Sequence, residues 1–333
     1  MAELWIDTKA VCRNYHYYAR QGMVIPVLKE DGYGLGAEAV LALLVKQGAS
    51  LFACARPEEA LRLSGKEADI LLLSCEYDRD ILRTLAERNV IFSLESLSQA
   101  REIQSIGLPV RVHLAVDTGF GRFGFPWEQA EQMKEVYRME QLQVCGIFSH
   151  FRGSKAVQEQ LGRFGRALET LRGYPTGLRH IASTAFADNP ACRFDAVRIG
   201  SGLTGWGGGV QAAAHLTARI CTLRRLPRGS RLGYGNIRLR RDTEVAILDI
   251  GTGDGAFLQR GCGPRAWWQS RHSVVRVNGL AAPVLGPPGL THTAVDVTGI
   301  SCGAGSLVEV EQTPILISPG VSRRYLANYS EGS

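Results

Sequence analysis

The chain has 333 residues, of which 21% are charged and 45% are hydrophobic, close to the average for a folded globular protein. This balance argues against disorder, and no apolar run approaches the roughly 18 uncharged residues that a membrane-spanning helix needs. The first residues show no basic start followed by a long apolar stretch, so we expect no secretory signal and no membrane partner. The length predicts about two domains.

The net charge of +6 is unevenly distributed, because eight arginines lie between Arg219 and Arg241 whereas the whole chain has six lysines. Such a cluster has two interpretations: a surface for an anionic partner such as nucleic acid, or solvent-facing arginines on alternating strands. Aromatic side chains are not interleaved with these arginines as stacking on bases would require. We therefore favour solvent-facing arginines and expect no nucleic-acid partner.

The eight cysteines form no CxxC pair, and none stands at metal-ligand spacing from a histidine. We therefore expect no metal site. Cys54, Cys75 and Cys145 lie in apolar, strand-like runs, which predicts buried free thiols. Free thiols are typical of a reducing compartment, so we expect the protein to be cytoplasmic.

In the first 200 residues, short apolar runs alternate with longer amphipathic ones. The expected strands are Val24–Lys29, Leu51–Ala55, Ile70–Ser74, Val90–Leu94, Val110–Asp117, Val144–His150, Leu178–Ser183 and Ala196–Ile199. The expected helices between them include Ala37–Gln47, Pro57–Leu63, Arg79–Glu87 and Ser96–Ile106.

Eight strand–helix units in about 200 residues predict a TIM (β/α)8 barrel rather than an open doubly wound sheet. An open sheet usually has fewer strands and a glycine-rich first turn, which this sequence lacks. After Trp206–Gly209 the helical periods stop, and short apolar runs are separated by Gly and Pro clusters. We predict a barrel over residues 1–212, followed by a C-terminal all-β domain over residues 213–333. The strands expected in the second domain include Val245–Ile250, Val274–Val277, Val284–Leu285 and Leu307–Val310.

Reactive groups of a TIM barrel stand at the C-terminal ends of its strands, and the first expected strand ends in Lys29. A desolvated lysine suits covalent chemistry with a carbonyl group, although position alone favours a lysine that reaches solvent at least equally. The sixth strand ends in His150, for which a site role and a structural role are about equally expected.

Small residues follow the seventh and eighth strands, where barrels often bind phosphate. Ser183, Thr184, Gly200 and Ser201 would let backbone N–H groups approach an anion. A phosphate site combined with a reactive lysine suggests pyridoxal 5'-phosphate as the cofactor.

Four segments, in matching order and spacing, resemble motifs of the alanine racemases, which are fold-type III pyridoxal-phosphate enzymes. The segment Pro26–Gly36 is similar to their cofactor-lysine motif, and Asp117–Gly124 to their strand-five motif. Gly146–Phe151 and Val197–Gly200 match two more. The resemblance covers nearly the whole chain, and the four motifs together are specific although each alone is weak.

The resemblance implies a role for each matching residue. Lys29 would hold the cofactor and act as one catalytic base, and Arg198 would face the pyridine nitrogen. Arg122 would hold a phenolate of the cofactor or a substrate carboxylate, and His150 would stack near the ring. The family further implies a head-to-tail homodimer, in which each β domain completes the site of the other subunit. The phosphate contacts implied are Tyr33, Thr184, Gly200 and Ser201.

The sequence departs from the family on the substrate side. A tyrosine that serves as the second base is replaced by Thr252, whose hydroxyl is a far weaker acid than a phenol. A second tyrosine falls at about Pro319, a lysine on strand five is Ala115, and a substrate-binding segment becomes Gly289–Thr291. Thr252 is therefore the least certain of the catalytic positions, and it predicts slow racemisation of alanine.

Three functions remain open at this point. The first is a pyridoxal-phosphate amino-acid racemase or epimerase, with an altered substrate or with Tyr234, His292 or water in place of the missing base. The second is another pyridoxal-phosphate reaction, such as decarboxylation, for which Cys262 and Cys302 are available. The third is a cofactor-binding protein without turnover. The overall resemblance favours the first, with an amino acid as the small-molecule substrate.

Overall fold

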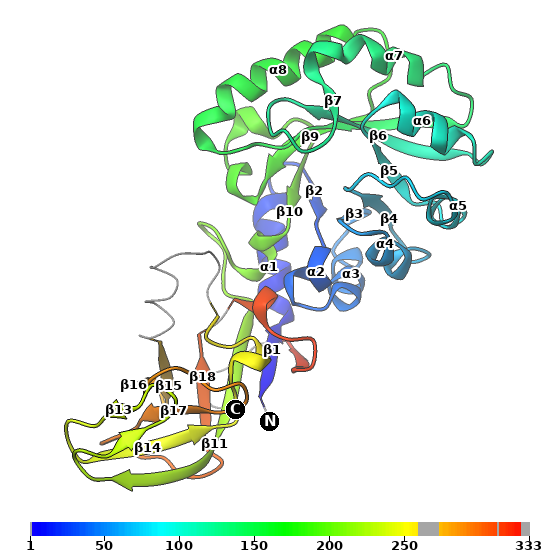
Figure 1. Cartoon of the computed structure of the whole chain (residues 1–333). Helices are drawn as coiled ribbons and strands as arrows, with labels where there is room; N and C mark the ends of the chain where they lie inside the picture. The colour runs from blue at the N-terminus through cyan, green and yellow to red at the C-terminus, as the bar shows by residue number, and fades with distance from the viewer. Residues whose placement is uncertain (1, 259–272, 312, 328–333) are drawn as a thin grey trace. The chain divides into compact units, whose positions relative to one another are not determined.

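The computed structural model describes residues 2–258, 273–311 and 313–327. The chain divides into two compact units, which we describe separately. Residues 11–211 form the barrel unit, whereas residues 1–10 and 212–333 form the β unit (Figure 1). None of the helices in the described ranges combines the length and apolar character needed to cross a membrane.

The barrel unit contains eight parallel strands in the order β2-β10-β9-β8-β6-β5-β4-β3. A parallel bridge between Val27 and Ala53 joins the two ends, so the barrel is nearly closed. The prediction of a (β/α)8 barrel is confirmed, as is each of the eight expected strands. Their bounds are β2 (Met23–Pro26), β3 (Leu51–Cys54), β4 (Asp69–Leu72), β5 (Ile91–Leu94), β6 (Val110–Asp117), β8 (Leu142–Phe148), β9 (Leu178–Ser183) and β10 (Ala196–Ile199).

The barrel helices lie outside the ring of strands (Figure 1). Their starts follow from the sequence: Pro57 opens one helix at a position that needs no N–H, and the Ser96 hydroxyl accepts a hydrogen bond from the Gln99 N–H at 3.2 Å. The helices are α1 (Thr8–Ala19), α2 (Lys29–Tyr33), α3 (Ala37–Val45), α4 (Pro57–Leu63), α5 (Arg79–Glu87), α6 (Leu97–Gln104), α7 (Met133–Val136) and α8 (Val157–Thr170). Short elements complete the unit: β7 (Phe125–Pro126), η1 (Trp127–Gln132), η2 (Ser154–Ala156), η3 (Thr184–Phe186), η4 (Pro190–Cys192) and η5 (Ser201–Thr204).

The inward side chains of the strands fill the barrel. A cluster of buried residues from five strands lies among them: Ile25, Val27, Leu51, Ala53, Leu71, Ile91 and Ala196. Strands buried on both faces are expected to be continuously apolar, which explains why all eight were visible in the sequence.

The β unit is built mainly on antiparallel sheet. Its long strand β11 pairs with β1, β14 and β18, and β1 also pairs in parallel with β19. The chain's first strand therefore belongs to the β unit, because both of its partner strands, β11 and β19, lie in that unit. The elements are β1 (Glu3–Asp7), β11 (Ala214–Leu226), β12 (Arg231–Leu232), β13 (Ile237–Arg238), β14 (Thr243–Leu248), η6 (Thr252–Asp254), β15 (Val274–Val277), β16 (Leu280–Pro283), β17 (Thr293–Asp296), β18 (Leu307–Val310), η7 (Pro314–Leu316) and β19 (Ser322–Leu326).

Four local expectations, including the burial of two cysteines, were wrong. Lys29 does not end a strand, because β2 stops at Pro26 and Lys29 begins α2. Val284 makes only an isolated bridge with Val295, and the neighbouring strand β16 ends at Pro283. Cys75 follows β4 in a loop and is half-buried, since the strand ends at Leu72. Cys54 is free and buried as expected, whereas Cys145 is free but only half-buried.

Candidate active site

A cavity of about 340 Å³ lies where the barrel strands end. Nine of the ten site residues expected from the sequence line it. They are Lys29, Tyr33, Arg122, His150, Ser183, Thr184, Arg198, Gly200 and Ser201. The tenth, Thr252, lies in the β unit. The structure thus brings together residues from strands β2, β6, β8, β9 and β10 and the loops that follow them.

Lys29 opens a turn of left-handed helix. Glu30, Asp31 and Gly32 have φ between 52° and 66° and ψ between 39° and 52°, and Tyr33 has φ 56°. Non-glycine residues in this conformation cost roughly 1–2 kcal/mol each, so the turn is a strained element. It brings both Lys29 and Tyr33 to the cavity, with the Lys29 Nζ 5.6 Å from the centre of the Tyr33 ring.

The Glu59 carboxylate braces this turn from helix α4. Its Oε1 accepts a hydrogen bond from the Glu30 N–H at 2.6 Å, and its Oε2 accepts from the N–H groups of Ala55 and Arg56 at 2.9 and 3.1 Å. Arg56 in turn pairs with the Glu30 carboxylate at 2.9 Å. Hydrogen bonds to a charged acceptor are stronger than neutral ones, which helps to offset the backbone strain beside Lys29.

The opposite wall is a cradle of glycine, backbone N–H and hydroxyl groups. The Thr184 hydroxyl accepts from the N–H groups of Gly200 and Gly202 at 3.4 and 3.3 Å. A Cβ on Gly200 would collide with the Tyr33 ring, and one on Gly202 would lie 2.7 Å from the Tyr18 ring. Only glycine therefore fits at these two positions. Hydroxyl groups that line a glycine-rich wall of this kind suit a phosphate.

Arg198 is a buried cation on β10, with 3% of its surface exposed. Its two terminal nitrogens donate to Ser149 O at 2.7 Å, His180 Nδ1 at 2.6 Å and His150 Nδ1 at 3.1 Å. Among the described residues, no carboxylate lies within ion-pair distance of the Arg198 guanidinium, and no carboxylate accepts a hydrogen bond from its Nε. Burial, reinforced by the charge of Arg122, lowers the pKa of Arg198 to about 9. The guanidinium thus stands at the cavity wall held by carbonyl and imidazole acceptors instead of a carboxylate.

A histidine chain that the sequence analysis missed holds Arg198 in place. Because arginine only donates, His180 Nδ1 accepts, and His180 Nε2 then donates to His113 Nδ1 at 2.9 Å. Burial, followed by the charge of Arg198, lowers the pKa of both histidines, in His113 to about 3. Both rings are therefore neutral. The available signal was a histidine with apolar residues on both sides or on one side of it in strands β6 and β9.

His150 is fixed from two sides. Its Nδ1 accepts from Arg198, and its carbonyl accepts from Gln160 Nε2 on α8 at 2.9 Å. The same Gln160 amide donates to Thr118 Oγ1, which pairs with the Ser149 hydroxyl at 2.8 Å. Burial, then the charges of Arg198, Arg122 and Lys29, lowers the pKa of His150 to about 3. His150 is thus a neutral acceptor rather than a proton donor.

Two exposed groups stand at the cavity rim. The Arg122 guanidinium lies 4.6 and 4.5 Å from the ring centres of Phe120 and Phe123, and burial lowers its pKa. Trp206, which the sequence analysis used only as a domain marker, lines the cavity with 58% of its surface exposed. Trp206 stands in the chain between Gly205 and Gly207, whose φ values are 100° and 132°, a region that glycine adopts far more readily than other residues.

Thr252 lies on η6 of the β unit. Its N–H and its hydroxyl both donate to Gly289 O, at 2.9 and 3.3 Å.

Cys302 is half-buried in the same unit, and Cys262 lies outside the described residues. Within the described ranges, no three His, Cys, Asp or Glu side chains come together as metal ligands.

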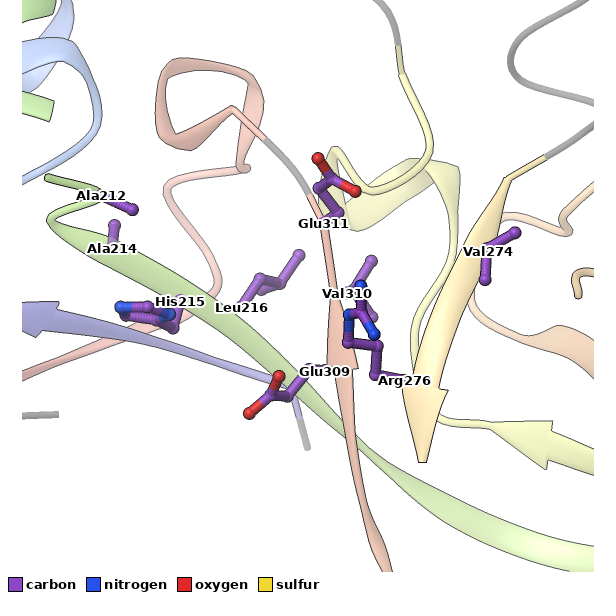
Figure 2. Close-up of a pocket in the computed structure, with 9 residues that line it drawn as sticks. All are labelled: Ala212, Ala214, His215, Leu216, Val274, Arg276, Glu309, Val310 and Glu311. Atoms are coloured by element: carbon purple, nitrogen blue, oxygen red, sulfur yellow. The ribbon is translucent and has the colours of Figure 1, made fainter. Parts of the chain in front are cut away.

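The β unit has a hollow of its own, of about 520 Å³. Figure 2 shows its side chains coming from β11, β15 and β18. Its charges are of mixed sign, and Arg276 stands directly opposite Glu309 in the strand pairing. It lacks the glycine and hydroxyl cradle of the barrel cavity, so the barrel cavity is the better candidate for the active site.

Two family models match the chain. Residues 6–207 match the alanine racemase N-terminal domain, and residues 213–328 match the alanine racemase C-terminal domain. The chain is 28% identical to the alanine racemase of Thermodesulfovibrio yellowstonii over 318 residues, covering 92% of this chain and 83% of the relative. It is 30% identical to alanine racemase 2 of Caldanaerobacter subterraneus subsp. tengcongensis over 319 residues, covering 87% and 79%.

Solved structures agree on the fold. The alanine racemase of Clostridium difficile 630 superposes with a TM-score of 0.88 at 22% identity, covering 98% of this chain and 95% of that one. An alanine racemase from Bartonella henselae with covalently bound pyridoxal phosphate superposes with a TM-score of 0.84 at 23% identity, covering 98% and 99%. The barrel followed by a β domain is thus a shared architecture.

Proposed function

The chain belongs to the alanine racemase family, and we propose on this premise that it is a pyridoxal-phosphate-dependent racemase that inverts Cα of an amino acid. One observation supports this most strongly: a single cavity combines a lysine, a phosphate-type cradle and a buried arginine that lacks a carboxylate partner. The relatives' names make alanine the first substrate to test.

The residues of the cavity fit the cofactor. When bound, pyridoxal phosphate supplies an electron sink that makes the Cα proton of an attached amino acid acidic. Tyr33, Thr184, Gly200 and Ser201 would hold its phosphate, with Ser183 beside them. The steric demand at Gly200 is consistent with this role, because a side chain there would displace Tyr33.

Arg198 would face the pyridine nitrogen. A guanidinium donates but cannot take a proton, so it would keep that nitrogen unprotonated. The histidine chain gives Arg198 one orientation, since both of its terminal nitrogens are already engaged. By keeping that nitrogen unprotonated, Arg198 would weaken the electron sink and leave more of the work to the acid–base groups.

Lys29 would anchor the cofactor and then hold or release the Cα proton through Nζ. Arg122 at the rim would bind a substrate carboxylate or a phenolic oxygen of the cofactor. His150, with its pKa lowered to about 3, would pack beside the ring and transfer no proton. Thr252 remains the proposed counterpart of the family's second base, with a hydroxyl poorly suited to that task.

We further propose a head-to-tail homodimer in the cytoplasm. In it, the barrel unit binds the cofactor, and the β unit, which includes residues 1–10, completes the site of the other subunit. Support for the location comes from the cysteines: the seven in the described residues are all free.

The test is incubation of the holoprotein with a panel of L- and D-amino acids in deuterated water, followed by chiral chromatography and mass spectrometry. Inversion of an amino acid with deuterium at Cα supports the proposal. Formation of an amine and carbon dioxide, or no change in any substrate, would overturn it.

A further inference from the structure

Among the residues that line the cavity, the candidate proton-transfer groups are few. Lys29 and Tyr33 belong to the same left-handed turn, and His150 is held neutral while accepting from Arg198. Racemisation through proton removal and delivery on opposite faces of Cα needs a second acid opposite Lys29. Apart from Lys29, Tyr33 and His150, the described residues that line the cavity carry hydroxyl, guanidinium, indole or apolar side chains, none of which is an ordinary acid–base group near neutral pH.

The β unit carries a phenol that has no packing role. Tyr234 lies in the turn between β12 and β13 with 89% of its surface exposed. A side chain at Gly289 would lie 3.6 Å from the Tyr234 Cε2. Gly289 is also the residue whose carbonyl accepts from Thr252. Tyr234 and Thr252 therefore both lie near Gly289, so the phenol is close to the position where the family's base is missing.

The segment that carries Tyr234 is strongly basic. We call residues 228–240 the basic ribbon, since they hold four exposed arginines and no acidic residue: Arg228, Arg231, Arg238 and Arg240. Arg231 stands directly opposite Arg238 in the pairing of β12 with β13. Like charges at such a position are destabilising, and these arginines have no carboxylate partner among the described residues. An anionic counterpart would relieve that cost.

The barrel mouth offers such a counterpart. The loops that follow β3, β4 and β5 carry the carboxylates of Glu76, Asp78 and Glu95, none of which is ion-paired with a described residue. Their only cation is Arg56, which is already paired with Glu30. This side of the mouth is therefore acidic, whereas the loops after β6 and β8 carry Arg122 and Arg152.

We propose that the basic ribbon docks on the acidic side of the barrel mouth of a second copy, and that its Tyr234 is the second acid–base group of the racemase. In one direction, Lys29 Nζ takes the Cα proton and the bonding electron pair stays on the substrate side. A new Cα–H bond then forms on the other face with the Tyr234 hydroxyl proton, which leaves a phenolate. Water returns a proton to the phenolate and takes one from Lys29. This inference rests on the proposed function and on the head-to-tail dimer.

The docking can be tested on the apoprotein without measuring turnover. Sedimentation should show weaker self-association for Arg231→Glu/Arg238→Glu, by about tenfold or more, and a dependence on salt. The control is Arg172→Glu, an exposed arginine on the barrel unit that pairs with Glu169. Nitration of Tyr234, read by mass spectrometry, should fall when the protein is concentrated enough to dimerise. Unchanged association of the double variant, or equal nitration at all concentrations, would overturn the docking.

The catalytic role is tested by Tyr234→Phe, which keeps the ring and removes only the hydroxyl. Inversion should fall by about 10²–10⁴ while Lys29-dependent deuterium exchange into one enantiomer persists. Tyr325→Phe, in another exposed tyrosine of the β unit, is the control. Mixing inactive Lys29→Ala with Tyr234→Phe should restore about a quarter of the wild-type activity, because half of the dimers then hold one intact site.

These outcomes separate the two proposals. If the wild type inverts an amino acid and Tyr234→Phe does so equally well, the inference fails and the proposed function stands. If the mixture stays inactive although both variants dimerise, Tyr234 does not serve a second copy. If the wild type inverts no amino acid and Lys29 binds no cofactor, the proposed function itself has failed.

Discussion

Gly200 offers the sharpest steric test of the phosphate cradle. In Gly200→Ala, the added Cβ would lie 2.5 Å from both Cζ and Oη of Tyr33 and closer still to Cε2. Tyr33 cannot retreat freely, because it sits in the left-handed turn at φ 56°. Gly200 has φ −118°, which alanine adopts without backbone strain, so the effect is purely one of space.

Overpacking of this kind costs about 1–3 kcal/mol, which corresponds to roughly 5- to 150-fold in affinity if the strain is relieved at the expense of cofactor binding. We expect Gly200→Ala to weaken pyridoxal phosphate binding within that range, measured by absorbance titration of the apoprotein. The matched control is Gly208→Ala, where an added Cβ meets no atom within 4 Å. Equal affinities of the two variants, at unchanged thermal midpoints, would refute the cradle.

Three further predictions follow from the same cavity. Borohydride reduction should fix the cofactor on Lys29 alone, and Lys29→Ala should abolish the label in peptide mapping; label on other lysines would contradict the assignment. Arg198→Glu should protonate the ring nitrogen and increase long-wavelength absorbance with substrate, whereas an unchanged spectrum would argue that Arg198 does not face the ring. The lowered pKa values of His113 and His150 mean that the unfolded chain binds more protons between pH 6.5 and about 3, so stability should fall with acidification by roughly 1.4 kcal/mol per pH unit for each histidine; unfolding free energies that stay flat over this window would refute their burial as neutral rings.

Much of the barrel could be predicted from the sequence because its strands are buried on both faces. The bounds of β6, β9 and β10 agree with the expected ones residue for residue. By contrast, β1 was missed, since its pairing with β11 and β19 is visible only once residues distant in sequence are brought together. The 13-residue strand β11 was also missed, because its arginines interrupt the apolar pattern that indicates a strand. Those arginines are exposed, as expected.

The candidate site was predicted residue by residue from motifs, but its supports were not. Glu59 and Gln160 act through hydrogen bonds to backbone groups on other elements, and nothing in their local sequence indicates this. The left-handed turn after Lys29 was also missed, because only one of its four positive-φ residues is a glycine. Local propensity favours neither Glu30 nor Tyr33 in that conformation, so contacts with other elements, such as the hydrogen bond from the Glu30 N–H to Glu59, must stabilise it.

The most direct measurement of the central claim is the rate at which each enantiomer of alanine and of other small amino acids appears in deuterated water. The holoprotein should convert one enantiomer into the other with deuterium at Cα, and Lys29→Ala should do neither. The Thr252 hydroxyl cannot replace a phenol, so inversion that keeps pace with exchange requires Tyr234, and Tyr234→Phe should leave exchange on one face that outpaces inversion. A holoprotein that carries pyridoxal phosphate on Lys29 yet neither exchanges nor inverts any amino acid would contradict the account.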